Sequence, residues 1–136
     1  MRYLLDTNVL SDARAKRSPR LLAWLQEQIV ADLQLSSITL LELERGVRRR
    51  AHRDPVGAAP LRRWLDEDVR GTFAGRVLPV DDEVAVAAAA LHVPDPMPEM
   101  DALIAATALV HGLTLVTRNI NDFTRVPITL LDPWTT

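Results

Sequence analysis

The sequence predicts an α/β domain in three layers, with helices on both faces of a central and mainly parallel sheet. Short apolar runs of strand length alternate along the chain with longer segments of helical periodicity, an order typical of strands joined by helical crossovers. With 136 residues, 48% of them apolar and 25% charged, the chain has the size and composition of one globular unit. We therefore expect residues 1–136 to form a single domain.

The first strand is expected at the apolar run Tyr3-Leu4-Leu5. This run ends abruptly at Asp6-Thr7-Asn8, which we expect to form a polar loop at the end of a buried strand. Ser18 as the N-cap and Pro19 in the first turn then predict an amphipathic helix. Its expected apolar face consists of Leu21, Leu22, Leu25 and Ile29.

A second strand is expected over residues 33–38, where apolar and polar side chains alternate. Thr39 opens the next helical pattern, which runs through several arginines until Asp54-Pro55-Val56-Gly57 interrupts it. A further helix is expected up to the region of Gly71 to Gly75. Its apolar positions are Leu61, Trp64, Leu65 and Val69.

The C-terminal half continues the alternation of strands and helices. Asp81 and Asp82 are suited to cap an alanine-rich helix that extends to about His92. A proline-rich loop separates it from a last helix, for which Pro98 lies in the first turn and Gly112 at the C-cap. Three more strands are expected at residues 77–80, 113–117 and 128–131.

Composition excludes several classes of site. The chain has no cysteine, which rules out disulfides, thiolate catalysis and cysteine-based zinc sites. The apolar run at the N-terminus is too short for a signal peptide, and no stretch approaches the roughly 20 apolar residues that a membrane helix needs. We therefore expect a cytoplasmic protein with no membrane segment.

The basic residues are unevenly distributed although the net charge is only -2. Any binding to nucleic acid must therefore be local. One short stretch contains a cluster of Arg45, Arg48, Arg49, Arg50 and Arg53. The cluster is equally consistent with a solvated helix face and with a surface that contacts an RNA backbone. Arg14, Lys16 and Arg17 are further candidates for backbone contacts.

Acidic and hydroxyl side chains occur where the expected strands end. In parallel sheets, ligands bind at the carboxyl ends of the strands, and Asp6, Thr117 and residues 119–122 are expected there. A few carboxylates suit Mg²⁺ or Mn²⁺, and such an ion can activate water for hydrolysis of a phosphodiester. The candidate acids are Asp6, Glu42, Asp101 and Asp122.

Each candidate also has a purely structural interpretation. Asp6 could be a polar exit from a strand, and Glu42 could form a capping box with Thr39. Asp101 could stabilise the first turn of its helix, and Asp122 could be an ordinary turn residue. These interpretations do not explain why all four acids fall within one ordered set of motifs.

That ordered set resembles PIN domains, and in particular toxins of the VapC type. The motifs occur in family order and span nearly the whole chain. They are Leu4-Leu5-Asp6-Thr7-Asn8-Val9, Thr39-Leu40-Leu41-Glu42-Leu43 with Gly46, Asp101-Ala102-Leu103-Ile104-Ala105-Ala106, and Thr117-Arg118-Asn119 with Asp122-Phe123. The resemblance implies a PIN-like α/β/α domain that cleaves RNA, with tRNA or rRNA as target, using Mg²⁺ or Mn²⁺. It also implies a homodimer and a VapB-like antitoxin in a heteromeric toxin-antitoxin complex.

The resemblance assigns the acidic core to Asp6, Glu42 and Asp101. Asp6 and Asp101 would be the main metal ligands, and Glu42 would orient or activate the attacking water. At the fourth position, relatives place an acid either where Asn119 stands or three residues later, at Asp122. We expect Asp122 to be the acid and a further metal ligand.

Three residues are expected to support these acids, namely Asn119, Thr117 and Thr7. Asn119 departs from relatives that carry an acid there, and as an amide it contributes no charge. This departure leaves one alternative function: a catalytically weak or inactive PIN-like module that binds nucleic acid or protein.

Overall fold

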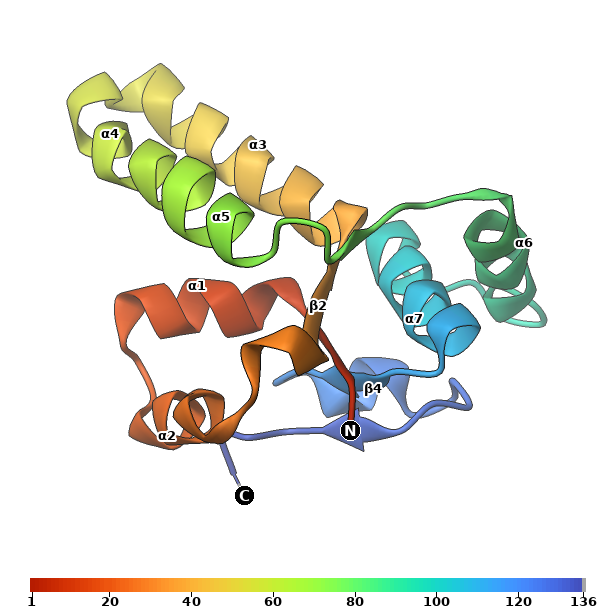
Figure 1. Ribbon diagram of the computed structural model, residues 1–136. Helices are drawn as coiled ribbons and strands as arrows, with labels where there is room; N and C mark the ends of the chain where they lie inside the picture. Colours follow the sequence, from red (N-terminus) through yellow and green to blue (C-terminus); the bar gives the residue numbers. More distant parts are fainter. Residues whose placement is uncertain (136) are drawn as a thin grey trace.

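The computed structural model describes residues 1–135 and contains a five-stranded parallel sheet with the order β3-β2-β1-β4-β5 (Figure 1). The strands are β1 (Tyr3–Leu5), β2 (Leu33–Ser36), β3 (Val77–Leu78), β4 (Thr114–Val116) and β5 (Leu130–Leu131). The central strand β1 pairs with β2 on one side and β4 on the other, both parallel to it. The prediction of a three-layer α/β/α domain is confirmed.

Helices cover both faces of this sheet. The N-terminal helices are α1 (Thr7–Ala15), α2 (Pro19–Glu27), η1 (Val30–Asp32), α3 (Ser37–Arg53), α4 (Pro55–Arg63), the π-helical η2 (Trp64–Val69) and α5 (Arg70–Thr72). The C-terminal ones are α6 (Asp82–Leu91), α7 (Glu99–His111) and η3 (Ile120–Phe123). Figure 1 shows α3, α4 and α5 together above α1, with α6 and α7 at the opposite end.

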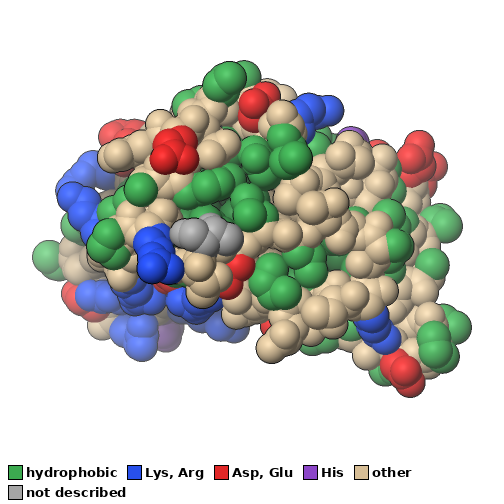
Figure 2. Space-filling model, turned by 90° about the horizontal axis from the view of Figure 1, so that it is seen from below, with side chains coloured by type: hydrophobic (Ala, Val, Ile, Leu, Met, Phe, Trp, Pro, Cys, Tyr) green, Lys and Arg blue, Asp and Glu red, His purple; other side chains and the backbone are tan. Residues whose placement is uncertain are grey.

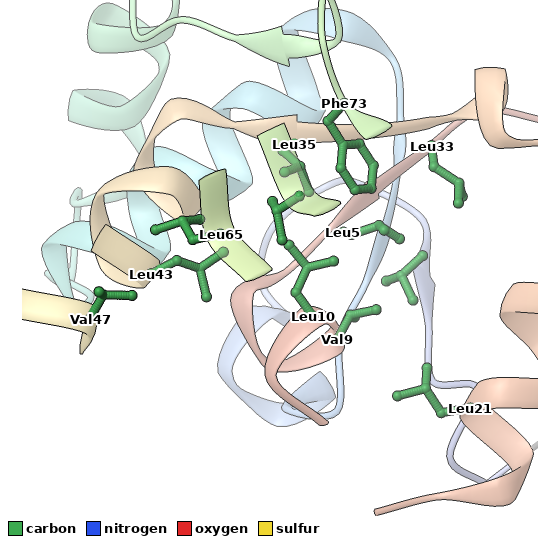
Figure 3. Close-up of a cluster of buried hydrophobic side chains, with 12 residues drawn as sticks. Leu5, Val9, Leu10, Leu21, Leu33, Leu35, Leu43, Val47, Leu65 and Phe73 are labelled. Atoms are coloured by element: carbon green, nitrogen blue, oxygen red, sulfur yellow. The ribbon is translucent and has the colours of Figure 1, made fainter. Parts of the chain in front are cut away.

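Alternate residues of the strands point to opposite faces and build two cores. On one face, Leu5 of β1 and Leu35 of β2 are buried with residues of α1, α3 and η2, as Figure 3 shows. On the other face, Leu4 and Leu115 are buried against Ile104 of α7. Because both faces are covered, the strands are mostly apolar, although buried Gln34 and Thr114 lie within β2 and β4.

Several predicted helix boundaries are confirmed. Ser18 caps α2, with its Oγ accepting a hydrogen bond from the Leu21 amide, and Asp81 caps α6 through the Val84 amide. Gly112 follows α7 in the left-handed conformation with φ of 64°, which glycine adopts without strain.

Other boundaries differ from prediction. Asp6-Thr7-Asn8 is not a loop, because β1 ends at Leu5 and α1 begins at Thr7. The strand predicted over residues 33–38 ends at Ser36, whose side chain accepts from the Ile38 amide, so that α3 begins at Ser37, two residues before Thr39. Ile29 lies outside α2 and is 69% exposed, so it is not part of an apolar helix face.

The charges are segregated between the two ends of the molecule. Residues 1–76 contain 14 Lys or Arg and ten Asp or Glu, whereas residues 77–117 contain six acids and no Lys or Arg. Figure 2 shows basic side chains gathered at the end formed by the N-terminal helices. Within residues 1–135, no helix is long and apolar enough to span a membrane.

Candidate active site

Asp6 and Thr117 meet at the carboxyl edge of the sheet because their strands are neighbours. Leu5 of β1 is paired with Val116 of β4, and the next residue along each chain is Asp6 and Thr117. Thr117 is fully buried, and its hydroxyl donates to Asp6 Oδ2 at 2.8 Å. Two residues 111 positions apart in sequence are thus fixed to each other by strand register.

The second oxygen of Asp6 is held by α1. Asp6 is the N-cap of this helix, and its Oδ1 accepts from the Thr7 amide at 2.8 Å. The positive end of the helix dipole favours a carboxylate in this position. Only 6% of Asp6 is exposed, so a nearly buried acid retains hydrogen bonds to both of its oxygens.

Glu42 reaches the same region from α3. Thr7 Oγ1 donates to Glu42 Oε1 at 2.7 Å and lies 3.2 Å from Thr39 Oγ1. Since Ser36 is the cap of α3, Glu42 lies in the second turn and the proposed capping box with Thr39 is wrong. The Glu42 carboxylate is therefore directed toward Thr7 at the start of α1.

Asp101 lies in the first turn of α7, as predicted, and is partly buried. Desolvation, followed by repulsion from Asp6, Asp122 and Glu42, raises the pKa of Asp101 to about 6. Within residues 1–135, no hydrogen-bond donor reaches its carboxylate to oppose these effects. The charges of the other three predicted acids therefore all act on Asp101, and we call these four residues the acidic centre.

Asp6 shows the same coupling from the other side. Burial raises the pKa of Asp6, the hydrogen bonds from Thr117 and Thr7 lower it, and the charges of Glu42 and Asp122 raise it further. Burial and repulsion outweigh the hydrogen bonds. In the folded protein both acids thus favour their protonated forms more than they would in water, and a nearby cation would reverse this preference.

The two residues considered for the fourth position occupy different places. Asp122 lies exposed in η3, and its charge acts on both Asp6 and Asp101. Asn119 is exposed, and its backbone amide donates to Thr117 Oγ1 at 3.0 Å. Asp122 therefore belongs to the acidic centre, whereas Asn119 is connected to it through its backbone amide and Thr117.

The donor set fits a hard divalent cation that keeps part of its water shell. All candidate ligands are carboxylate oxygens, which Mg²⁺ and Mn²⁺ prefer. Among residues 1–135, no three histidine or acidic side chains are arranged to hold one metal ion between them. Such an ion would be bound by fewer direct protein contacts and by bridging waters, which suits Mg²⁺ better than a closed cage.

Two contacts next to the site were not predicted. Asp12 of α1 is only 2% exposed and accepts a hydrogen bond from Arg118 Nη1 at 2.6 Å. Asn8 Oδ1 accepts from the Arg118 amide at 3.5 Å. These contacts join positions more than 100 residues apart, and no local pattern in the sequence indicates them.

Comparison with known proteins identifies the family. A family model described as the PIN domain matches residues 3–128. Toxin FitB of Neisseria gonorrhoeae is 36% identical, over 96% of this chain and 97% of its own. VapC ribonuclease Y4jK of Sinorhizobium fredii is 32% identical over 96% of each chain.

A solved structure agrees with these matches in fold. The crystal structure of FitAcB from Neisseria gonorrhoeae superimposes with a TM-score of 0.86 at 34% identity, covering 98% of this chain and 99% of that one. The match extends over the sheet and the helices on both faces. The chain therefore belongs to the PIN-domain family, in the group that includes these VapC-type toxins.

Proposed function

We propose that the protein is a metal-dependent endoribonuclease that acts as the toxin of a toxin-antitoxin pair and cleaves tRNA or rRNA. The observation that carries this proposal is the electrostatic coupling of Asp6, Glu42, Asp101 and Asp122 at the carboxyl edge of the sheet. Its relatives include a protein named as a VapC ribonuclease, and PIN-domain nucleases of this type generally depend on a divalent metal.

In this proposal the four acids have separate tasks. Asp6, Asp101 and Asp122 hold Mg²⁺ or Mn²⁺, directly or through water. The bound ion supplies Lewis acidity, which stabilises the charge that develops on the scissile phosphate, and lowers the pKa of a bound water. Glu42 orients the attacking water or accepts its proton, and Thr7 fixes the Glu42 carboxylate by its 2.7 Å hydrogen bond.

An arginine stripe on α3 supports RNA as the substrate. Arg45, Arg49 and Arg53 follow each other at four-residue intervals and form no ion pair within residues 1–135, whereas Arg48 and Arg50 pair with Glu44 and Asp54. These three arginines line a surface groove of about 790 Å³ together with Leu41 and His52. Three unpaired guanidinium groups, rising about 6 Å per step, suit successive phosphates of an RNA strand.

The activity is tested by incubating the protein with tRNA and rRNA in Mn²⁺, Mg²⁺ or EDTA and mapping the new RNA ends. We expect metal-dependent cleavage by the wild type and none by Asp6→Asn. Asp95→Asn is the matched control, because it makes the same chemical change at an exposed residue that does not act on Asp101. Binding without cleavage in every metal would favour the inactive module instead.

The arginine stripe has its own test. Arg49→Gln should raise KM for RNA severalfold with kcat nearly unchanged, because it removes a phosphate contact remote from the reacting bond. Arg50→Gln is the control, since Arg50 is already paired with Asp54. Equal effects of the two substitutions would remove the stripe from the RNA path.

We further propose that this toxin forms a homodimer in the cytoplasm and binds a VapB-like antitoxin in a heteromeric complex. A nuclease that attacks the RNA of its own cell must be silenced while growth continues, and a relative is named as a toxin. Expression with and without the product of the neighbouring gene tests this partner. Growth arrest that the neighbour relieves, and that Asp6→Asn abolishes, is the expected result.

A further inference from the structure

A buried carboxylate outside the acidic centre has three hydrogen-bond donors from separate parts of the chain. Asp12 lies in α1 and is 2% exposed. Its Oδ2 accepts from Arg118 Nη1 at 2.6 Å and from Trp134 Nε1 at 3.2 Å, and its Oδ1 accepts from Arg17 Nη1 at 3.3 Å. A carboxylate so deeply buried is costly unless its charge is compensated, and here two arginines do so.

Arg118 connects this carboxylate to the candidate site. It stands between Thr117, whose hydroxyl donates to Asp6, and Asn119, whose amide donates to that same hydroxyl. Its guanidinium also lies over the Trp134 ring, 5.9 Å from the centroid. The segment that leads to Asp122 therefore contacts α1 through the side chain of Arg118 as well as through its backbone.

These hydrogen bonds lie in a row between α1, with its N-cap Asp6, and residues 117–119. At one end, Asp6 accepts from Thr117, and at the other, Asp12 accepts from Arg118. Asn8 lies between them in sequence, and its Oδ1 accepts a hydrogen bond from the Arg118 amide at 3.5 Å. Asp6 caps α1 and Asp12 lies within it, so a displacement of Arg118 would shift the Thr117 hydroxyl relative to the Asp6 carboxylate.

We propose that Asp12 is a positioning residue which, through Arg118 and with Trp134 as a brace, holds residues 117–122 in register with Asp6. This inference rests on the proposed function in so far as Asp6 and Asp122 serve the metal. Asp12 itself touches neither metal nor substrate. Its contribution is to fix the hydroxyl that orients Asp6 and the start of the turn that carries Asp122.

The charged partners of Asp12 offer a matched pair of variants. Arg118 and Arg17 both contact the carboxylate, but only Arg118 belongs to the segment next to the acids. Arg118→Gln should therefore disturb residues 117–122, whereas Arg17→Gln should not. Asp12→Asn keeps the shape of the side chain and removes the charge that both arginines compensate.

The first measurement is hydrogen exchange in the metal-free protein, at peptides covering residues 117–126. We expect Asp12→Asn and Arg118→Gln to increase the exchange rates of these peptides about tenfold, with no increase in β2. The largest increase is expected at the Asn119 amide, which donates a hydrogen bond to the Thr117 hydroxyl. Arg17→Gln should exchange as the wild type does. This measurement needs no catalysis, so it stands even if RNA cleavage is not found.

The second measurement is Mn²⁺ affinity by calorimetry without RNA, followed by kcat and KM. Loss of a residue that supports metal ligands weakens metal binding about tenfold or more, and we expect this for Asp12→Asn and Arg118→Gln. For Asp12→Asn, kcat should fall with KM within about twofold of wild type, because no RNA contact is removed. A merely structural role would lower stability and leave the Mn²⁺ affinity unchanged.

Should Asp12→Asn fail to fold, Trp134→Phe provides the milder test. It removes one N–H donor and keeps an aromatic ring against the core. A smaller increase in exchange at residues 117–122 is expected. The proposal is overturned if the folded variants retain wild-type exchange and Mn²⁺ affinity, or if Arg17→Gln has the same effects as Arg118→Gln.

Discussion

The acidic centre has two sides that the protein holds in different ways. On the anchored side, Asp6 and Glu42 accept short hydrogen bonds from Thr117 and Thr7. On the open side, formed by Asp101 and Asp122, no donor within residues 1–135 reaches either carboxylate. The comparison indicates that the anchored side is preorganised by the fold, whereas the charge on the open side is compensated by no hydrogen bond and calls for a cation or a proton.

Replacing one acid on each side should have the largest effect, and should separate activity from stability. Asp6→Asn and Asp101→Asn are each expected to reduce RNA cleavage by about 10²-fold or more, because each removes a negative charge that holds the metal ion, and the ion neutralises the charge that develops on the phosphate. Initial rates measured with Mn²⁺ and tRNA test this.

The same two variants should differ in the metal-free protein. Asp101→Asn removes repulsion and loses no hydrogen bond, so its Tm should rise above that of the wild type. Asp6→Asn loses an acceptor for Thr117 or Thr7, and its Tm should not rise as much. A lower Tm for Asp101→Asn than for the wild type would contradict the inference that the Asp101 carboxylate is destabilised by repulsion and accepts no hydrogen bond.

Metal addition should stabilise the wild type by relieving repulsion across both sides. At a free Mn²⁺ concentration of 100 times Kd, binding to the folded state alone adds about 2.7 kcal/mol to the free energy of unfolding. The shift, followed by calorimetry, should be largely lost in both Asp6→Asn and Asp101→Asn. An unchanged shift in either variant would place the bound ion away from that acid.

Thr117→Val tests the anchored side by itself. It leaves buried Asp6 Oδ2 without its short hydrogen bond and the Asn119 amide without an acceptor, which should cost about 1–3 kcal/mol of unfolding free energy. Thr107→Val is the control, because that buried hydroxyl only donates to the Leu103 carbonyl of its own helix. Denaturant titration of both variants gives the difference, and equal losses would show that Thr117 has no special role.

The smallest effect is a pH dependence from the open side. The pKa of Asp101 is raised from 3.8 to about 6, so between these pH values the folded protein holds a proton that the unfolded chain releases. Metal-free stability should therefore be greatest below about pH 4 for this group and fall as pH rises to about 6. The slope of Tm against pH should be shallower in Asp101→Asn, and an identical slope would contradict the assignment.

Local patterns in the sequence were sufficient for the sheet and most helices. Ser18, Asp81 and Gly112 mark helix ends through short-range chemistry that a sequence displays directly. The helix α1 was missed for a physical reason. Asp12 is buried on it like an apolar residue, and two of the three donors that make this burial tolerable, Arg118 and Trp134, lie more than 100 positions away.

The candidate site also has one part that local sequence patterns predict and another that depends on tertiary packing. The four acids follow from their motifs, and strand order brings Asp6 next to Thr117. The link between Thr7 and Glu42 could not be predicted, because it depends on how α1 packs against α3. Thr39 and Glu42 have the spacing of a capping box, yet Ser36 caps the helix, so spacing alone assigned the wrong partner.

The absence of Lys and Arg from residues 77–117 also bears on how quickly a polyanion finds the site. The end with α6 and α7 repels an approaching RNA, and the arginine-rich end attracts it, so the molecule turns during diffusion and encounters begin in one orientation. Salt screens this torque beyond a Debye length of about 10 Å at 0.1 M. The association rate constant should therefore fall with ionic strength even where the chemical step does not.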